Sequence, residues 1–357
     1  MNAFKKNLFL LFTFNIILFV FKIVYCEKPL PAFSKLVVFG DSLSCPGNFY
    51  WANGKTHPSG PFYDGRFTDG PLWIEVLAEM LNLEVPKSIY NNGYNFAHAG
   101  ARSRGGYTLL DGSFLYKHTY GNCSKDVFNA QDFNDKYITV NIAQQVDDFV
   151  LKGVPDIGSV LVSIQGSCND LLDEILPSET IENMKFNIIR LTLAGVKYFV
   201  VADFPPLELI PISYQISHNI LCDSNSWTGD LCEYYLTSKL GEFSLYNGLY
   251  LVSRGNMLLS SISYNTPLRE MLSQLEHDLN ITIIPVSLCD FIENIYNDPL
   301  KQHLIWDRSV IDKDVCMVRE DSENYVFFDD VHPTAHIHDL FGKYAHKTIL
   351  EHFQKLE

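Results

Sequence analysis

The chain has 357 residues, and 27 lysine and arginine residues against 42 aspartate and glutamate residues give a formal net charge of −15. This balance argues against nucleic acid as a partner, because binding a phosphate backbone requires clustered cations. Hydrophobic residues make up 47% of the chain and charged residues 19%, which excludes the composition typical of disordered chains. We therefore expect an acidic globular protein with a large buried core.

The first 26 residues have the pattern of a secretory signal peptide. Lys5 and Lys6 precede an apolar run from Leu8 to Phe21, and Val24 and Cys26 flank a cleavage point. The apolar run is shorter than the roughly 18 to 20 residues that a membrane-spanning helix needs, so a retained anchor is the less favoured alternative. We predict a secreted mature protein with no stable membrane insertion once the signal is removed.

Secretion would allow disulfides to persist. After Cys26 is removed with the signal, seven cysteines remain. Because seven is odd, at least one thiol is expected to be unpaired. The pairs closest in sequence that would staple loops are Cys222 with Cys232 and Cys289 with Cys316, although spacing alone does not fix the pairing.

Residues 27–357 are expected to form a single domain, because no linker, repeat or charge block marks a boundary. Glycosylation acceptor sequences begin at Asn122 and Asn280, which is consistent with secretion. No feature of the sequence indicates the oligomeric state.

Short apolar runs alternate with longer amphipathic segments along the chain. Buried strands are predicted at 36–39, 160–164, 198–201 and 281–286. Helices are predicted at 71–81, 142–151, 180–193, 237–251, 267–279 and 334–353. This alternation predicts an α/β fold with a central, mainly parallel sheet covered on both faces, a three-layer αβα sandwich. Such a sheet carries its chemistry beyond the carboxyl ends of its strands.

A candidate nucleophile follows the first predicted strand. Ser42 lies in the sequence Gly40-Asp41-Ser42-Leu43, although an Asp-Ser pair after a strand is also an ordinary turn or helix cap. The glycine-rich elbow of α/β-hydrolases is absent, because Ser44 occupies its second glycine position. A serine hydroxyl requires a base to become a nucleophile.

A candidate base lies near the other end of the chain. Asp329 and His332 are three residues apart, just before the last predicted helix, so the carboxylate can orient the ring. Pro333 suits the first turn of that helix. The alternative interpretation is a solvated, histidine-rich helix start.

Ester chemistry also requires donors for a developing oxyanion. Asn169 follows the predicted strand at 160–164, and its carboxamide can donate there. Gly100 follows small residues in the segment 95–101, where a backbone N–H can approach a ligand closely. Each segment alone is also typical of a plain turn, but together they supply a nucleophile, a base, an orienting carboxylate and oxyanion donors.

A metal site is the alternative use of the same residues. Asp329, Asp330, His332, His336 and His338 lie close in sequence, and a four-residue histidine spacing suits one helix face. No second ligand cluster accompanies them, so one catalytic base with exposed neighbours explains the histidines better. We therefore expect no metal, and chelator sensitivity would separate the two interpretations.

These motifs together resemble the GDSL lipase/esterase family, also called SGNH hydrolases. Four blocks occur in the family's order across residues 36–340, namely Gly40-Asp41-Ser42-Leu43 with Gly47-Asn48, the segment 95–100, Asn169-Asp170 and Asp329-x-x-His332. The segment 65–73 is similar to the one that follows the nucleophile block in longer members.

The resemblance implies hydrolysis of carboxylic esters through an acyl-enzyme, with no metal or organic cofactor. Ser42 would be the nucleophile, His332 the general base and then acid, and Asp329 the residue that orients His332. The oxyanion donors would be the backbone N–H groups of Ser42 and Gly100 and the side chain of Asn169.

Two positions depart from the family pattern. Ser167 stands where the third block usually has glycine, with Gly166 one residue earlier, which bears on the loop that carries Asn169. Cys45, followed by Pro46, stands where long members usually have an acidic residue. The second departure affects the loop after the nucleophile more than the chemistry.

The substrate class implied by the resemblance is a small-molecule or lipid ester, with lipid or short-chain acyl groups. Phe49, Tyr50 and Trp51 follow Ser42 closely, and we predict that they line the acyl or sugar pocket. Two alternatives remain open: an acetyl esterase acting on polysaccharide, and a catalytically inactive secreted binding protein on the same fold.

Overall fold

The computed structural model describes residues 30–111, 136–166, 168–172, 175–211, 245–301, 303–313 and 316–354. Several positions discussed above lie outside these ranges, namely residues 1–26, Asn122, Ser167, Cys222 and Cys232. Within the described part of the chain, no helix combines the length and the apolar character needed to cross a membrane.

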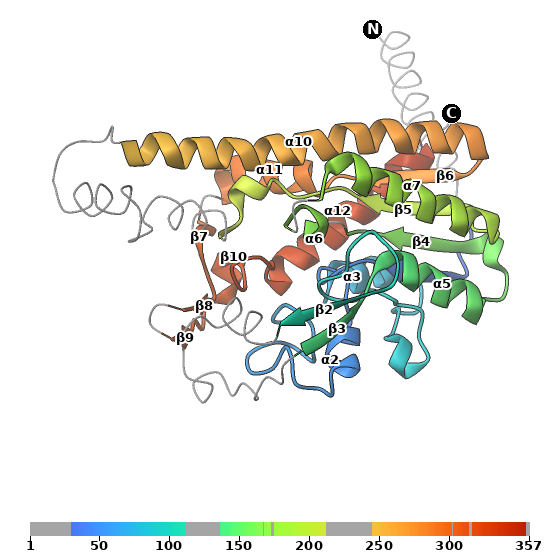
Figure 1. Ribbon diagram of the computed structural model, residues 1–357, viewed down its shortest axis with the longest axis horizontal. Coiled ribbons are helices and arrows are strands. Elements are labelled where there is room, and N and C mark those ends of the chain that lie inside the picture. Colours follow the sequence, from blue (N-terminus) through green and yellow to red (C-terminus); the bar gives the residue numbers. More distant parts are fainter. Residues whose placement is uncertain are drawn as a thin grey trace, which may run out of the picture.

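A parallel sheet forms the centre of the fold (Figure 1). Its strands are β1 (Lys35–Phe39), β4 (Val160–Ile164), β5 (Tyr198–Ala202) and β6 (Thr282–Val286), in the spatial order β1-β4-β5-β6. Each falls on one of the predicted apolar runs, to within one residue at its ends. Parallel strands covered on both faces are expected to be apolar throughout, which is why sequence located them well.

The two edges of this sheet differ. Beyond β1, the segment around Asn95 adds a short parallel bridge, in which Val38 N donates to Tyr94 O at 3.0 Å and Phe96 N donates to Val38 O at 2.8 Å. At the opposite edge, β6 contains an exposed proline, Pro285. Proline is tolerated there because an edge strand does not need every backbone donor.

Helices cover both faces of the sheet, which confirms the predicted three-layer αβα sandwich (Figure 1). One face packs against α3 (Trp73–Met80), α11 (Leu288–Asn297) and α12 (Ala335–Gln354). The other packs against α5 (Ile142–Lys152), α7 (Pro177–Leu193) and α10 (Leu245–Leu279). Alternate residues of β1 serve the two cores: Leu36 and Val38 enter the first, and Val37 and Phe39 enter the second.

Shorter elements complete the described chain. They are α2 (Asn48–Ala52), the antiparallel pair β2 (Tyr107–Asp111) and β3 (Lys136–Val140), α6 (Cys168–Leu172), β7 (Ile305–Ser309), β8 (Ile311–Asp312), β9 (Met317–Val318) and β10 (Tyr325–Phe327). Strand β10 pairs with β7 in parallel, and β8 pairs with β9 antiparallel. These elements lie outside the central sheet.

The helix α10 differs from the prediction. Two helices were expected at 237–251 and 267–279, whereas one helix runs from Leu245 to Leu279 with Pro267 inside it; residues 237–244 lie outside the described ranges. A proline removes one helical hydrogen bond, but it does not break a helix whose neighbouring turns are held by packing. The turns on both sides of Pro267 are held in this way, through the buried residues Tyr264, Leu268, Leu272 and Leu275.

One of the expected disulfides is wrong. Cys316 is disulfide-bonded, but Cys289 is a thiol whose Sγ lies 3.7 Å from Glu293 Oε1. The expected pairing rested on the fact that Cys289 and Cys316 follow one another among the cysteines in the sequence. Spacing in sequence does not determine distance in the fold.

The end of β1 is fastened by a side chain from α5. Gln145 Oε1 accepts from Gly40 N at 2.9 Å, and Gln145 Nε2 donates to Gly40 O and to Val140 O, each at 2.9 Å. Gly40 is required there, because its φ is +156° and a Cβ would lie 2.2 Å from Gln165 O. The Gln145 amide therefore bonds the backbone at the point where the strand passes into the candidate site.

We predict that Gln145→Met lowers the free energy of unfolding by about 2 to 4 kcal/mol, because it leaves buried backbone groups of Gly40 and Val140 without this partner. Urea unfolding measures the change. The control is Gln144→Met on the same helix, where the amide is partly exposed and bonds only Asp148. Equal stability of the two variants would contradict the prediction.

Candidate active site

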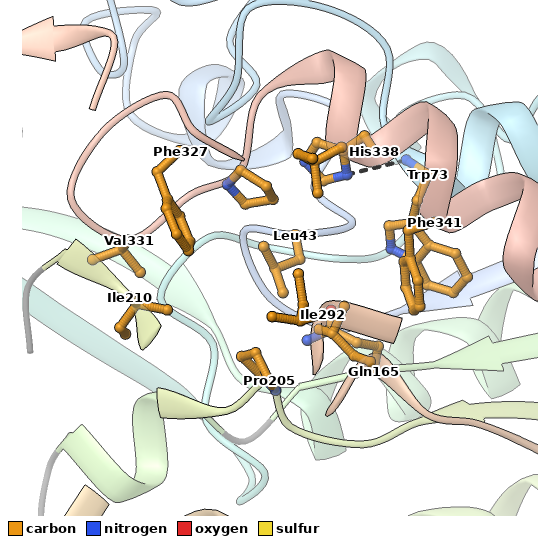
Figure 2. Close-up of a pocket in the computed structure, with 13 residues that line it drawn as sticks. Leu43, Trp73, Gln165, Pro205, Ile210, Ile292, Phe327, Val331, His338 and Phe341 are labelled. Atoms are coloured by element: carbon orange, nitrogen blue, oxygen red, sulfur yellow. Dashed lines mark hydrogen bonds between the residues drawn. The ribbon is translucent and has the colours of Figure 1, made fainter. Parts of the chain in front are cut away.

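The candidate catalytic segments meet at the carboxyl end of the sheet. Ser42 lies in the turn directly after β1, Asn169 lies on α6 after β4, and His332 lies between β10 and α12. Leu43, next to Ser42, lines the same pocket as Val331 and Pro333, which flank His332 (Figure 2). The fold therefore brings together residues that are about 290 positions apart in the sequence.

His332 and Asp329 form a hydrogen-bonded pair. The ring atom Nδ1 lies 2.7 Å from Asp329 Oδ2 and 2.9 Å from Oδ1, so a neutral ring that donates from Nδ1 keeps a lone pair on Nε2. Among the described residues, no protein atom hydrogen-bonds to His332 Nε2. The pair therefore presents a basic nitrogen that the protein itself does not use.

Asp329 remains ionised despite its burial. Burial by itself would raise the pKa of this carboxyl, but the His332 ring and the backbone N–H groups of His332 and Val331 hold the pKa below its ordinary value. Those N–H groups donate to Asp329 Oδ1 at 2.7 and 2.9 Å. The loop thus wraps around the carboxylate that orients the ring.

The segment 65–73 supports this loop from outside. Thr68 Oγ1 donates to Pro333 O at 2.9 Å, and Asp69 Oδ1 accepts from Ala335 N, in the first turn of α12, at 2.7 Å. The Phe67 ring centroid lies 5.0 Å from that of His332. The block that resembled longer family members therefore packs directly against the candidate base.

The turn that carries Ser42, the candidate nucleophile, is held by a chain of buried polar side chains. Asp41 Oδ1 accepts from Leu43 N at 3.1 Å across Ser42, and Asp41 Oδ2 accepts from Gln165 Nε2 at 3.3 Å. Ser44 Oγ donates to Gln165 Oε1 and accepts from the Trp73 indole, each at 3.2 Å. Gln165 belongs to none of the motifs of the sequence analysis, and Trp73 belongs to the segment 65–73 only as its last residue, so the local sequence does not indicate these long-range contacts.

Burial raises the pKa of Asp41 to about 6, against the opposing effects of its hydrogen bonds with Leu43 and Gln165 and the nearby charge of His332. The carboxyl is only 2% exposed. Its charge therefore changes over a range of pH close to neutral.

The segment 95–100 is fastened to the nucleophile loop. Asn48 Nδ2 donates to Asn95 O at 2.8 Å and to Ala97 O at 2.9 Å, and Asn95 Nδ2 donates to Ser44 O at 2.9 Å. These buried amides fix the backbone that leads to Gly100.

Three donors remain available for an oxyanion. Within the described chain, the backbone N–H groups of Ser42 and Gly100 donate to no protein acceptor. Asn169 Nδ2 donates to Ala101 O at 3.1 Å, which uses one of its two hydrogens. Gly100 has a φ of +75°, and a Cβ there would lie 2.9 Å from Leu110 Cδ1, so glycine suits this position.

The aromatic run after Ser42 does not line the apolar pocket of Figure 2. Phe49 is 1% exposed and stacks on Tyr137 in the core. Trp51 is 39% exposed and stacks on Tyr90, and Tyr50 packs at Gly65. Phe49 is therefore a core residue, and a role of Tyr50 and Trp51 in lining an acyl or sugar pocket stays a prediction.

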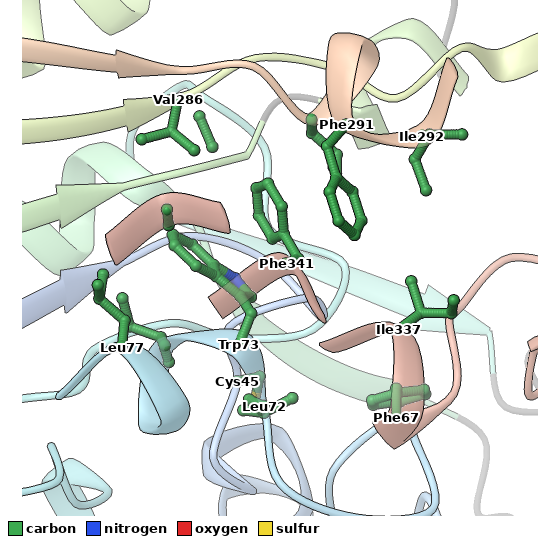
Figure 3. Packing of buried hydrophobic residues seen from close by; sticks show 14 of the residues in the cluster. Cys45, Phe67, Leu72, Trp73, Leu77, Val286, Phe291, Ile292, Ile337 and Phe341 are labelled. Atoms are coloured by element: carbon green, nitrogen blue, oxygen red, sulfur yellow. The ribbon is translucent and has the colours of Figure 1, made fainter. Parts of the chain in front are cut away.

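The apolar pocket lies between the nucleophile turn and the helices of one layer (Figure 2). Its walls are Leu43, Trp73, Gln165, Pro205, Ile210, Leu288, Ile292, Phe327, Val331, Pro333, Ile337, His338 and Phe341. Trp73, Ile292, Ile337 and Phe341 also belong to the hydrophobic core, as Figure 3 shows. Because the Trp73 and Phe341 ring centroids are only 4.8 Å apart, one wall of the pocket is part of the rigid core.

Within the residues that the structure describes, no group of three or more His, Cys, Asp and Glu side chains could hold a metal ion. Two of the residues that suggested a metal site have other contacts. Asp330 forms an ion pair with Lys313, and His338 Nδ1 accepts from Trp73 N at 3.2 Å.

Comparisons with known proteins show which chains this one is similar to. A family model described as GDSL-like Lipase/Acylhydrolase matches residues 36–345. A GDSL esterase/lipase from Arabidopsis thaliana is 24% identical over 95% of this chain and 96% of that protein. A phosphatidylcholine-sterol acyltransferase from Aeromonas hydrophila is 52% identical over 48 residues, which are 13% of this chain and only 14% of that protein. A crystal structure of a lipolytic G-D-S-L family member from Veillonella parvula is 13% identical, with a TM-score of 0.35 over 89% of this chain and 97% of that chain.

The chain is a carboxylic-ester hydrolase, and it belongs to the GDSL-like lipase/acylhydrolase family.

The pH dependence of stability provides a test of the buried Asp41. Its pKa rises from 3.8 to about 6 in the folded protein, so between these values the folded state keeps a proton that the unfolded state has released. Stability should therefore fall as pH rises from 4 to 6, by on the order of 3 kcal/mol for this group.

We predict that Asp41→Asn removes this contribution, so that the free energy of unfolding falls less steeply, or rises, over pH 4 to 6. Urea unfolding at several pH values measures the slope. The control is Asp339→Asn, where the side chain is 40% exposed and the wild-type slope should persist. A wild-type slope in Asp41→Asn would show that this carboxyl does not titrate in that range.

Proposed function

We propose that this protein is a secreted serine hydrolase that cleaves carboxylic esters through an acyl-enzyme on Ser42. The observation that carries the proposal is the Asp329–His332 pair. Its Nε2 atom has no hydrogen-bond partner among the described residues, and it lies on the same side of the fold as the Ser42 turn, at the carboxyl end of the sheet. The proposed reaction requires no metal and no organic cofactor.

In the first half of the reaction, Ser42 Oγ attacks the ester carbonyl while His332 Nε2 takes the serine proton. The carbonyl oxygen becomes an oxyanion that accepts from the N–H groups of Ser42 and Gly100 and from Asn169 Nδ2. His332 then returns the proton to the alkoxide, the alcohol leaves, and the acyl group remains on Ser42.

In the second half, water attacks the acyl-enzyme. His332 takes a proton from the water, the same donors hold the new oxyanion, and His332 gives the proton back to Ser42 as the carboxylic acid leaves. In each half His332 becomes a cation for a moment, and the carboxylate of Asp329 stabilises it through the hydrogen bond to Nδ1. The ionised Asp41 adds a second negative charge near the ring.

The pocket beside the nucleophile turn supports an acyl chain as the group recognised. Its walls are almost wholly aliphatic and aromatic, and Leu43 joins it to Ser42. Burying methylene groups there contributes about 0.8 kcal/mol each, whereas a sugar would leave its hydroxyls without partners. We therefore favour lipid or other acyl esters over acetylated polysaccharide as substrates.

Three observations support secretion. Residues 1–26 have the pattern of a signal peptide. Cys316 is disulfide-bonded, and disulfides are rare in the cytosol. Asn280, in the second acceptor sequence, is exposed between α10 and β6 and is accessible for glycosylation.

The serine mechanism is tested by hydrolysis of p-nitrophenyl esters from acetate to palmitate. We expect Ser42→Ala to lose at least about 10³-fold in kcat, because the nucleophile is removed while the fold is kept. Circular dichroism and the melting temperature control for folding. Retention of wild-type turnover by Ser42→Ala would contradict the mechanism, and an inactive wild-type protein would favour the binding-protein alternative.

The acyl pocket is tested by narrowing it. Ile292→Phe should lower kcat/KM for palmitate esters by about 10-fold or more and leave acetate turnover nearly unchanged, because a larger ring fills the space for the chain. The matched control is Ile295→Phe, one turn along α11 and similarly buried but outside the pocket walls. Chain-length profiles that are identical for both variants would exclude this pocket as the acyl site.

A further inference from the structure

The two oxyanion donors outside the nucleophile turn lie on segments that are far apart in sequence. Gly100 ends the segment that follows Asn95, and Asn169 lies on α6 after β4. An oxyanion hole works only when its donors lie about 2.7 to 3.1 Å from the oxyanion. Some contact must therefore set the spacing between the Gly100 loop and α6.

Ser103 and Asp170 make that contact. Ser103 Oγ donates to Asp170 Oδ1 at 2.6 Å, and Ser103 N donates to Oδ2 at 2.9 Å and to Oδ1 at 3.2 Å. Both residues are 0% exposed. Ser103 lies three residues after Gly100 and Asp170 directly follows Asn169, so the contact joins the two donor segments next to the donors themselves.

The second link between the same segments involves Asn169. Its Nδ2 atom donates to Ala101 O at 3.1 Å, immediately beyond Gly100. The carboxamide and the neighbouring carboxylate thus hold the same loop at Ala101 and at Ser103, which fixes its orientation as well as its distance.

The surrounding elements hold Ser103 from the other side. Asn183 Nδ2 donates to Ser103 Oγ at 3.1 Å, and Asn187 Nδ2 donates to Ser103 O at 3.1 Å, both from α7. Burial raises the pKa of Asp170, and its bonds with Ser103 and the charges of Arg102 and Arg104 oppose that rise. A carboxylate cannot itself stabilise an oxyanion, so any effect of Asp170 on the reaction must act through the loop that it holds.

We propose that Asp170 is a positioning residue of the oxyanion hole, which acts by binding Ser103 and thereby sets the spacing between the Gly100 N–H and the Asn169 carboxamide. This inference rests on the serine mechanism proposed above. Asp170 does not touch the substrate, so its loss should weaken oxyanion stabilisation while substrate binding is kept.

The test compares three buried-residue variants of the full chain. Asp170→Asn removes the charge. Ser103→Ala removes one of the three hydrogen bonds with Asp170, together with the bond from Asn183. Ser163→Ala, on β4, removes a buried hydroxyl that has no hydrogen-bond partner. We expect kcat to fall by about 10-fold or more in Asp170→Asn and Ser103→Ala, with KM unchanged. Ser163→Ala should stay within about 2-fold of wild type.

An inhibitor separates positioning from a general loss of structure. A trifluoromethyl ketone that carries the acyl chain adds Ser42 Oγ to its carbonyl and places an oxyanion in the hole, whereas the product carboxylic acid does not. The affinity for the ketone should weaken by the same factor as kcat in Ser103→Ala, and the affinity for the acid should not change.

The inference is overturned if folded Ser103→Ala keeps wild-type kcat and wild-type affinity for the ketone, or if ketone and acid affinities weaken equally. The Ser103→Ala result decides the matter if Asp170→Asn does not fold. Ser42→Ala, measured in parallel, separates the two levels of the account. If that variant is active, the serine mechanism fails and the inference with it, whereas if it is inactive and Ser103→Ala is normal, only the inference fails.

Discussion

The hydrogen bond between Asp329 and His332 Nδ1 is the constraint on which the rest of the site depends. It fixes which ring nitrogen donates, and so leaves Nε2 as the basic atom. The bond forms because the backbone wraps around the carboxylate and keeps it ionised in a buried place. Three other parts of the site are arranged around that nitrogen: the turn that carries Ser42, the supporting segment 65–73 and the apolar pocket.

Similar contacts between buried polar side chains and the backbone occur elsewhere near the carboxyl end of the sheet. Buried side-chain amides and carboxylates bond the backbone where the regular hydrogen bonding of the sheet ends. Gln145 holds the end of β1, Asn48 holds the segment that begins at Asn95, and Asp170 holds Ser103. A buried backbone group without a partner costs about 1 to 3 kcal/mol, so each of these contacts specifies one loop conformation. The two apolar cores stabilise the layers, and these polar contacts determine the geometry of the site.

The sequence predicted the layers well because their signals are local. Four apolar runs became the four strands of the central sheet, whose carboxyl end carries Ser42 after β1 and Asn169 after β4, whereas His332 follows β10, outside that sheet. Features set by contacts across the fold could not be read in this way. Pro267 suggested a helix start but lies inside α10, where packing on both sides holds the helix. Likewise, the contacts by which Gln165 and Trp73 support the Ser42 turn are not visible in the local sequence, and Phe49 faces the core despite its closeness to Ser42.

The most direct test of the account is peptide mass spectrometry of the protein after reaction with an alkyl fluorophosphonate, which is attacked only by an activated nucleophile. The account predicts one phosphonyl adduct on the peptide that contains Ser42, with simultaneous loss of esterase activity. An adduct on another residue, or full activity in unlabelled protein after prolonged treatment, would contradict the claim that His332 and Asp329 activate Ser42.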